Sequence, residues 1–225
     1  MASASSRSVQ WTTKQIPALV GIGLFPLLWS LGAWSSQTTG QGDVELAVRA
    51  GAASQVLIAS EPWRLITASL FNLNLQHLVT NVAGLIGFGV FALPLFGGVR
   101  LWNICWLSAW VGTLVAILSP GIVLGSSAGF FGILGATVIT LFWRVPSDRR
   151  WLVAIVAIVI AALMLMSPGD HLAHVGGLIT GMCLAKVFRV SPSENAGTKP
   201  RDWYITGTIL AAQTGACMLT MWNSY

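Results

Sequence analysis

The sequence predicts an all-α membrane protein, built as a bundle of spanning helices. Only 8% of the 225 residues carry a charged side chain, against about 25% in a typical soluble domain. The chain also holds 11 tryptophans, a residue that favours the interface between bilayer and water. Several apolar stretches approach the length of about 20 residues that a spanning helix needs.

Seven such stretches predict seven transmembrane helices. They cover residues 15–34, 77–97, 101–119, 127–143, 151–167, 171–188 and 203–222. The first could be mistaken for a secretory signal peptide, because Arg7 and Lys14 precede it. It is long for a signal segment and lacks a small-residue cleavage site, so we expect it to be retained.

These spans divide the chain into four expected parts. They are a cytoplasmic N-terminal tail (1–14), a six-span core (15–188), a cytoplasmic linker (189–202), and a seventh span with a short outer tail (203–225). Within the core, residues 35–76 contain no clean spanning run and are expected to form an outer loop.

The distribution of Lys and Arg predicts the orientation. With the N-terminus in the cytoplasm, the inner segments hold ten of the 12 basic residues, and the outer segments hold only Arg49 and Arg64. The positive-inside rule therefore places the N-terminus in the cytoplasm and the C-terminus outside. The expected location is the inner membrane of a bacterium. Because the basic residues form no single patch, we expect the lipid bilayer, and not nucleic acid, as a partner.

Four polar residues on three different spans are expected at one depth, near the outer face. They are His77 and Asn81 on the second span, Ser127 on the fourth and His174 on the sixth. Polar groups at membrane depth are costly and are usually functional. Each residue alone also fits a structural role, in helix packing or at the interface. The expected convergence of these four residues from three spans favours a functional site over four separate structural roles.

These residue types are those of a serine hydrolase. A serine becomes a nucleophile when a neutral histidine accepts its proton, and the free N–H groups at a helix N-terminus can stabilise an oxyanion. Ser127 stands where a helix is expected to begin, and Asn and His side chains can add further donors. The sequence contains no His, Cys, Asp and Glu cluster with metal-ligand spacing, so we expect no metal and no cofactor.

Glycines predict that the fourth and sixth spans touch. The sets are Gly129, Gly132 and Gly135 on the fourth span, and Gly177 and Gly181 on the sixth. Faces of small residues let two membrane helices approach closely, and this contact would bring His174 within hydrogen-bond reach of Ser127. Gly125 would let the preceding loop approach the reacting backbone.

Four stretches of the chain match a set of motifs in order. They are "EPWRLITASLFN" (61–72), "HLVTN" (77–81), "GSSAGFFGILGA" (125–136) and "AHVGGLITG" (173–181). Together they resemble the rhomboid family of intramembrane serine proteases, over about residues 61–188. The resemblance implies a six-helix core plus one C-terminal span.

The resemblance also implies roles for individual residues. Ser127 would be the nucleophile and His174 its general base, with His77, Asn81 and the Ser127 N–H stabilising the oxyanion. The family's supporting positions correspond to Gly125, Phe131, Trp63 and Arg64. Phe131 would pack against the catalytic histidine, and the Trp-Arg pair would be structural residues of the outer loop.

Two positions depart from the family pattern. Ala128 follows the nucleophile where glycine is common, and Ser126 takes a place often held by alanine. Gly125, Gly132 and Gly135 align with the glycines of the family motif only if Ser127, and not Ser126, is the nucleophile. We call this alignment the glycine register. Asp170 could orient His174 as in a triad or cap the sixth helix; the family's Ser-His dyad favours the cap. His171 is expected to be interfacial.

The sequence therefore predicts an endopeptidase that cuts single-span membrane proteins near the outer face by a Ser-His dyad. One alternative is an inactive rhomboid-like protein that binds membrane clients, although such relatives typically lose the serine or the histidine. Another is a rhombosortase, which processes proteins with a C-terminal anchor, because "LFNLNLQHLVTNVAGL" is similar to that subgroup. A transporter is disfavoured, since no acidic residue lies within a span and no repeat is evident. The sequence predicts neither a natural substrate nor an oligomeric state.

Overall fold

The structure is a computed structural model that describes residues 15–37, 42–166, 170–188 and 198–223, without the side chains of residues 161 and 163–166. The described part is helical and has no β-strand; two loop segments meet in one isolated β-bridge. The long helices are α1 (Ile16–Ser35), α5 (Leu75–Phe96), α6 (Gly98–Ala116), α7 (Ser127–Arg144), α8 (Arg150–Met166), α9 (His171–Val187) and α10 (Pro200–Asn223). The short ones are α2 (Asp43–Arg49), α3 (Leu57–Ser60), α4 (Arg64–Thr67) and the 3₁₀ turn η2 (Ser147–Arg149).

The long helices coincide with the predicted spans, with ends that differ by at most three residues. Four of them, α1, α5, α6 and α7, are long and apolar enough to cross a membrane. Helices α8 and α9 have 17 residues each, and α10 is longer but less apolar. The all-α membrane bundle is thus confirmed, while the count of seven spans stays a prediction. The predicted tail (1–14) and most of the linker (189–202) lie outside the described residues.

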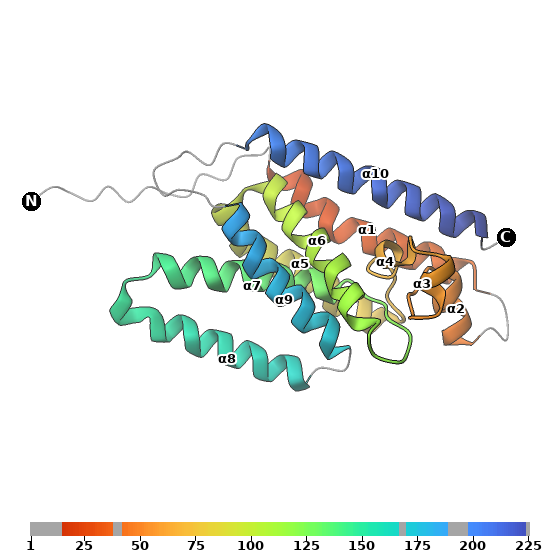
Figure 1. Cartoon of the computed structure of the whole chain (residues 1–225), viewed down its shortest axis with the longest axis horizontal. Helices are drawn as coiled ribbons and strands as arrows, with labels where there is room; N and C mark the ends of the chain where they lie inside the picture. The colour runs from red at the N-terminus through yellow and green to blue at the C-terminus, as the bar shows by residue number, and fades with distance from the viewer. Residues whose placement is uncertain (1–14, 38–41, 167–169, 189–197, 224–225) are drawn as a thin grey trace, which may run out of the picture.

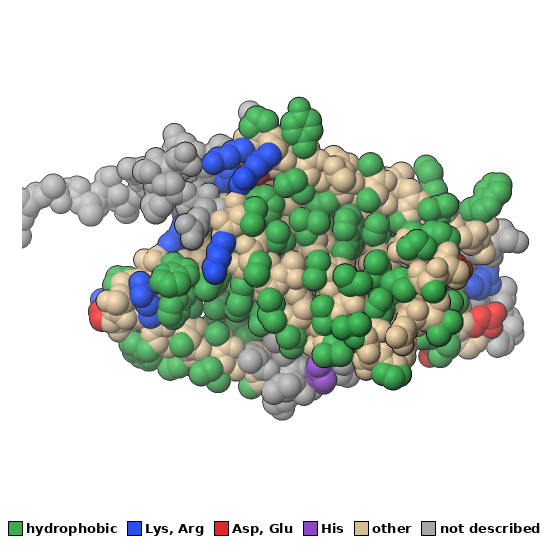
Figure 2. Space-filling view, in the orientation of Figure 1, with side chains coloured by type: hydrophobic (Ala, Val, Ile, Leu, Met, Phe, Trp, Pro, Cys, Tyr) green, Lys and Arg blue, Asp and Glu red, His purple; other side chains and the backbone are tan. Residues whose placement is uncertain are grey.

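Helix α6 forms the centre of the bundle and packs against α1, α5, α7, α9 and α10. Helices α1 and α10 lie along one flank in Figure 1, and α8 lies at the opposite edge. The core around α6 is rich in aromatic rings: Phe25 and Trp102 make edge-to-face contacts with each other and with Trp106. Apolar side chains cover the middle of the face in Figure 2, and charged side chains lie mostly toward its two ends. This distribution is expected of a protein whose middle part is surrounded by the hydrocarbon core of a bilayer.

Helices α7 and α9 are in backbone contact, as the glycine spacing predicts. A Cβ atom at Gly181 would collide with the carbonyl of Gly132, and one at Gly177 would collide with that of Ala128. Helix α6 joins this contact through Gly112, where a Cβ would lie 2.6 Å from the Ala173 oxygen. Helices α6, α7 and α9 therefore approach one another so closely that a side chain larger than a hydrogen atom at these glycines would collide with a neighbouring backbone.

The segment expected as the outer loop contains no long helix, and it folds into the short helices α2, α3 and α4. Arg64 is 6% exposed and ties these turns together. Its guanidinium donates to the carbonyl oxygens of Val48 (2.6 Å) and Ala52 (3.0 Å), and it forms an ion pair with Glu61 (2.8 Å). Arg64 therefore has a structural role in the loop, and Trp63, partly buried, stands at the start of α4.

A buried ion pair fastens α10 to the central helix. Arg100 on α6 lies 2.8 Å from the carboxylate of Asp202 on α10, and their side chains are 5% and 0% exposed. Asn103 donates to the Asp202 carbonyl (3.0 Å) and accepts from the Thr206 hydroxyl (2.8 Å). We call these four residues the α6–α10 latch.

Removing the carboxylate of the latch should destabilise the protein. Losing one partner of a buried ion pair typically costs about 3–5 kcal/mol, because the other charge stays buried. We expect Asp202→Ala to lower the unfolding midpoint in a thermal scan of detergent-purified protein. Asp148→Ala is the matched control, since its pair with Arg149 spans 3.9 Å between exposed side chains and should contribute little. Equal midpoints for the two variants would contradict the latch.

Candidate active site

A serine and a histidine meet at the N-terminal ends of α7 and α9. Ser127 is the first residue of α7, and His174 lies in the first turn of α9. The Ser127 Oγ is 2.9 Å from the His174 Nε2. His174 is 4% exposed, whereas Ser127 is partly exposed. A neutral imidazole at this distance can accept the hydroxyl proton.

The ring of Phe131 packs against the imidazole of His174. Phe131, one turn after Ser127 on α7, has its ring centroid 4.4 Å from that of His174, at an interplanar angle of 41°. This is the contact that the resemblance implied for Phe131. His171 lies on the exposed side of α9, with its ring centroid 6.2 Å from that of His174, which fits the interfacial role expected of it.

Asp170 acts as the N-cap of α9. Its Oδ1 accepts hydrogen bonds from the backbone N–H groups of Leu172 (2.9 Å) and Ala173 (3.3 Å). Aspartate is among the residues preferred at this position, because it satisfies N–H groups that have no partner within the helix. Of the two readings of Asp170, the structure favours the cap over a triad.

The outer loop holds the segment that leads into Ser127. Ala53 and Val123 form an antiparallel bridge, with N–H···O distances of 3.0 and 2.8 Å. Gly125 donates its N–H to the Ala68 oxygen (2.8 Å) and has a φ of +108°, a conformation that favours glycine. The chain then turns into α7, whose first N–H groups have no partner within the helix.

His77 and Asn81 face the same loop from α5. A Cβ atom at Gly125 would lie 2.9 Å from Cε1 and 3.0 Å from Nε2 of the His77 ring, and 3.5 Å from Nδ2 of Asn81. Asn74 caps α5 by accepting the His77 N–H (2.9 Å), so the first turn of this helix is well defined. The structure therefore brings the four predicted residues to one region, around the start of α7.

The comparison with known proteins assigns the family. The model described as "Rhomboid domain" matches residues 59–191, more than half of the chain. This chain belongs to the rhomboid family. It is 31% identical to "RHOMBOID-like protein 6, mitochondrial" of Arabidopsis thaliana over 145 residues, which are 61% of this chain and 47% of the relative.

Two further relatives bear on activity. "Rhomboid protease GluP" of Bacillus subtilis (strain 168) is 28% identical over 156 residues, 65% of this rhomboid and 30% of GluP. "Inactive RHOMBOID-like protein 8" of Arabidopsis thaliana is 31% identical over 127 residues, 53% of this rhomboid and 36% of the relative. The chain thus spans less than half the length of each relative named here. Because one is named a protease and another inactive, family membership does not by itself assign an activity.

One buried contact of this rhomboid was not predicted from its sequence. The Asn81 Nδ2 donates to the Asn72 Oδ1 (2.6 Å), and Asn72 in turn donates its backbone N–H to the Ser30 Oγ (3.0 Å). All three side chains are buried. One signal was present: a hydroxyl in the apolar first span is costly unless it has a partner. The partner itself lies 42 residues away and has no local signature.

Ser126 differs from its neighbour in its surroundings. It is 1% exposed, and its carbonyl oxygen accepts from the N–H groups of Gly129 (3.1 Å) and Phe130 (3.3 Å) in the first turn of α7. Of the two adjacent hydroxyls, the one on Ser127 is bonded to His174. The arrangement agrees with the choice of Ser127 by the glycine register.

Proposed function

We propose that this rhomboid is an intramembrane serine endopeptidase that works by a dyad of Ser127 and His174. The observation that carries the proposal is the 2.9 Å contact between Ser127 Oγ and His174 Nε2. His174 accepts the hydroxyl proton while Ser127 attacks the scissile carbonyl carbon, and then gives that proton to the departing amine. Water, activated in the same way, hydrolyses the acyl-enzyme and restores Ser127. Retention of both residues speaks against an inactive client-binding protein.

The negative charge that forms on the carbonyl oxygen is assigned to three donors. They are the backbone N–H of Ser127 at the positive end of α7, and the side chains of His77 and Asn81 beside Gly125. Donors fixed before the reaction stabilise a developing oxyanion strongly in a site with little water. The bond from Asn81 to Asn72 uses one amide hydrogen and leaves the other for the oxyanion.

The proposed clients are membrane proteins with a single span, cut near the outer face of the membrane. The N-terminus of this rhomboid would be cytoplasmic and its C-terminus outside, in the inner membrane of a bacterium, as the distribution of Lys and Arg indicates. A spanning helix hides its carbonyl groups in hydrogen bonds. A client must therefore unwind locally before Ser127 can attack it.

Helix α8 is the proposed side of client entry. Helices α7 and α9 are in backbone contact and leave no room between them. In contrast, α8 carries large apolar side chains that remain exposed, among them Leu152, Ile155 and Ile158. A client helix can pack against this face and reach Ser127 around the end of α8. The rhombosortase alternative has less support, because Phe131 occupies the place where that subgroup tends to carry a second histidine.

Replacing the nucleophile gives the direct test. We expect Ser127→Ala to abolish cleavage of a single-span model client in proteoliposomes, because no other residue replaces the attacking oxygen. Ser126→Ala should cleave as the wild type does. A fluorophosphonate probe should label the wild type and Ser126→Ala but not Ser127→Ala. The reverse pattern would assign the nucleophile to Ser126, and labelling of neither serine would contradict a protease.

The oxyanion donors should affect turnover more than stability. Asn81→Ala should lower kcat about 10²–10³-fold, the usual loss for one such donor. Asn72→Ala should lower kcat about tenfold with KM unchanged, because it frees the Asn81 amide to rotate. Asn103→Ala is the control: this equally buried asparagine belongs to the latch, so the variant should lose stability but keep its kcat. If Asn72→Ala only lowered the unfolding midpoint, Asn72 would be a structural residue.

Helix-breaking residues in a client should speed its cleavage. Glycine or proline in the outer half of a model client's span lowers the cost of unwinding, and leucine at the same positions should slow the reaction. The site of the cut is read by mass spectrometry of the products. A cut at the cytoplasmic end, or equal rates for the two sets of clients, would argue against the proposed clients.

A further inference from the structure

The segment that joins α7 to α8 carries an excess of positive charge. Residues 144–150, which we call the basic turn, contain three arginines and one aspartate. The basic turn lies at the edge of the molecule in Figure 1, where charged side chains gather in Figure 2. Its one aspartate, Asp148, lies 3.9 Å from Arg149, and both of these side chains are exposed. Arg150 is therefore left to find its counter-charge elsewhere.

Arg150 lies against two aromatic rings at the start of α8. Its guanidinium carbon is 5.4 Å from the ring centroid of Phe142 and 5.4 Å from that of Trp143, both in the last turn of α7. The electrons of an aromatic face attract a cation as a whole. They do not satisfy its N–H groups as an oxygen acceptor does. The two rings thus position the guanidinium and leave its donors without an oxygen partner.

No acid of the described part of the chain neutralises Arg150. The ion pairs found there join other residues, and the Nε of Arg150 is buried without a hydrogen-bond partner. Burial of a charged group is costly unless the group is paired. The side chain is only partly buried, so an anion can reach it from the surface. These contacts favour a counter-ion that does not belong to the chain.

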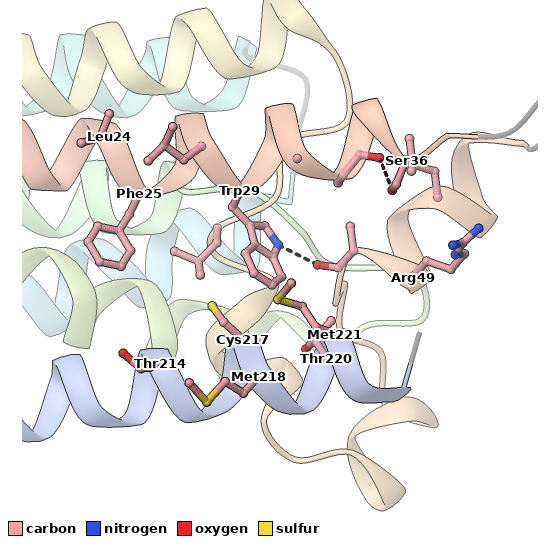
Figure 3. A pocket seen from close by; sticks show the side chains of 16 residues that line it. Leu24, Phe25, Trp29, Ser36, Arg49, Thr214, Cys217, Met218, Thr220 and Met221 are labelled. Carbon is pink, nitrogen blue, oxygen red and sulfur yellow. Dashed lines mark hydrogen bonds between the residues drawn. The ribbon is translucent and has the colours of Figure 1, made fainter. Parts of the chain in front are cut away.

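Two tryptophans indicate where this anion comes from. Trp143 in the last turn of α7 is 63% exposed, and Trp151 in the first turn of α8 is 58% exposed. Trp29 differs, because it lines a pocket between α1 and α10 and donates its indole N–H to the Ala50 oxygen (2.9 Å; Figure 3). Exposed tryptophans at the ends of apolar helices favour the bilayer surface. The anions at that depth are lipid phosphates.

We propose that the basic turn binds the phosphate of one anionic glycerophospholipid through the guanidinium of Arg150. Paired N–H groups of a guanidinium match two phosphate oxygens. A zwitterionic lipid would bring an ammonium group next to three arginines and one aspartate, so an anionic headgroup fits better. Binding uses neither Ser127 nor His174, and it does not depend on the proposed protease activity.

Native mass spectrometry of the full chain in detergent, titrated with palmitoyl-oleoyl-phosphatidylglycerol, tests this proposal. Arg150→Gln should weaken binding of the tightest-bound lipid about tenfold, the usual loss of a charge-assisted hydrogen bond. Lys186→Gln is the matched control: it removes the same charge from an exposed position in the last turn of α9, and it should change the affinity by less than about twofold. Equal losses in the two variants would overturn the proposal.

The geometry of the contact is tested separately from its charge. Arg150→Lys keeps the charge but has no planar pair of donors, so it should bind the lipid about fivefold more weakly than the wild type. Trp143→Leu removes one ring and no charge, and it should weaken binding about threefold. Wild-type affinity in Arg150→Lys would reduce the site to general attraction between charges and would overturn the proposal.

The nature of the ligand is tested on the wild type. Palmitoyl-oleoyl-phosphatidylcholine, which adds an ammonium group, should bind about fivefold more weakly than the anionic lipid. Phosphatidylglycerol should raise the unfolding midpoint of the wild type more than that of Arg150→Gln, and inorganic phosphate should leave both midpoints unchanged. Equal affinities for the two lipids, or an equal rise with inorganic phosphate, would contradict an anionic lipid as the ligand. The midpoints without lipid show whether each variant is folded.

Discussion

The backbone contact between α7 and α9 is the constraint on which the site depends. Gly177 and Gly181 let the backbone of α9 rest on the carbonyl groups of α7, and this approach sets the 2.9 Å distance between Ser127 and His174. A hydrogen bond weakens over a few tenths of an ångström, whereas a methyl group would separate the helices by more than that. The glycines therefore affect the proposed reaction by setting the distance between Ser127 and His174, although none of their own atoms takes part in it.

The nucleophile is positioned from two directions. The helices of the membrane bundle place His174 and its Phe131 support, while the outer loop places the segment before Ser127 through the Ala53–Val123 bridge. Arg64 acts on the second of these, because its hydrogen bonds to the carbonyl oxygens of Val48 and Ala52 hold together the loop that carries the bridge. The residues of the first outer loop thus matter to the site without touching the dyad.

The features that could be predicted from the sequence are those with a local or periodic signature. Runs of apolar residues predicted the long helices, and glycine spacing predicted that Ser127 and His174 would meet. The bond of Asn81 to Asn72 and the latch could not be predicted in this way. Each depends on segments far apart in the chain, such as Ser30 with Asn72, and polar residues in apolar helices show that a partner is needed without showing which one.

The latch also sets an order of assembly during synthesis. Arg100 and Asp202 are 102 residues apart, so at about 5–20 residues per second a ribosome makes α6 roughly 5–20 s before the carboxylate that binds it. Until then the Arg100 side chain lacks its ion pair with Asp202. A chain that ends before Asp202 would therefore keep the cost of a buried guanidinium without this carboxylate, a cost that completion of α10 removes.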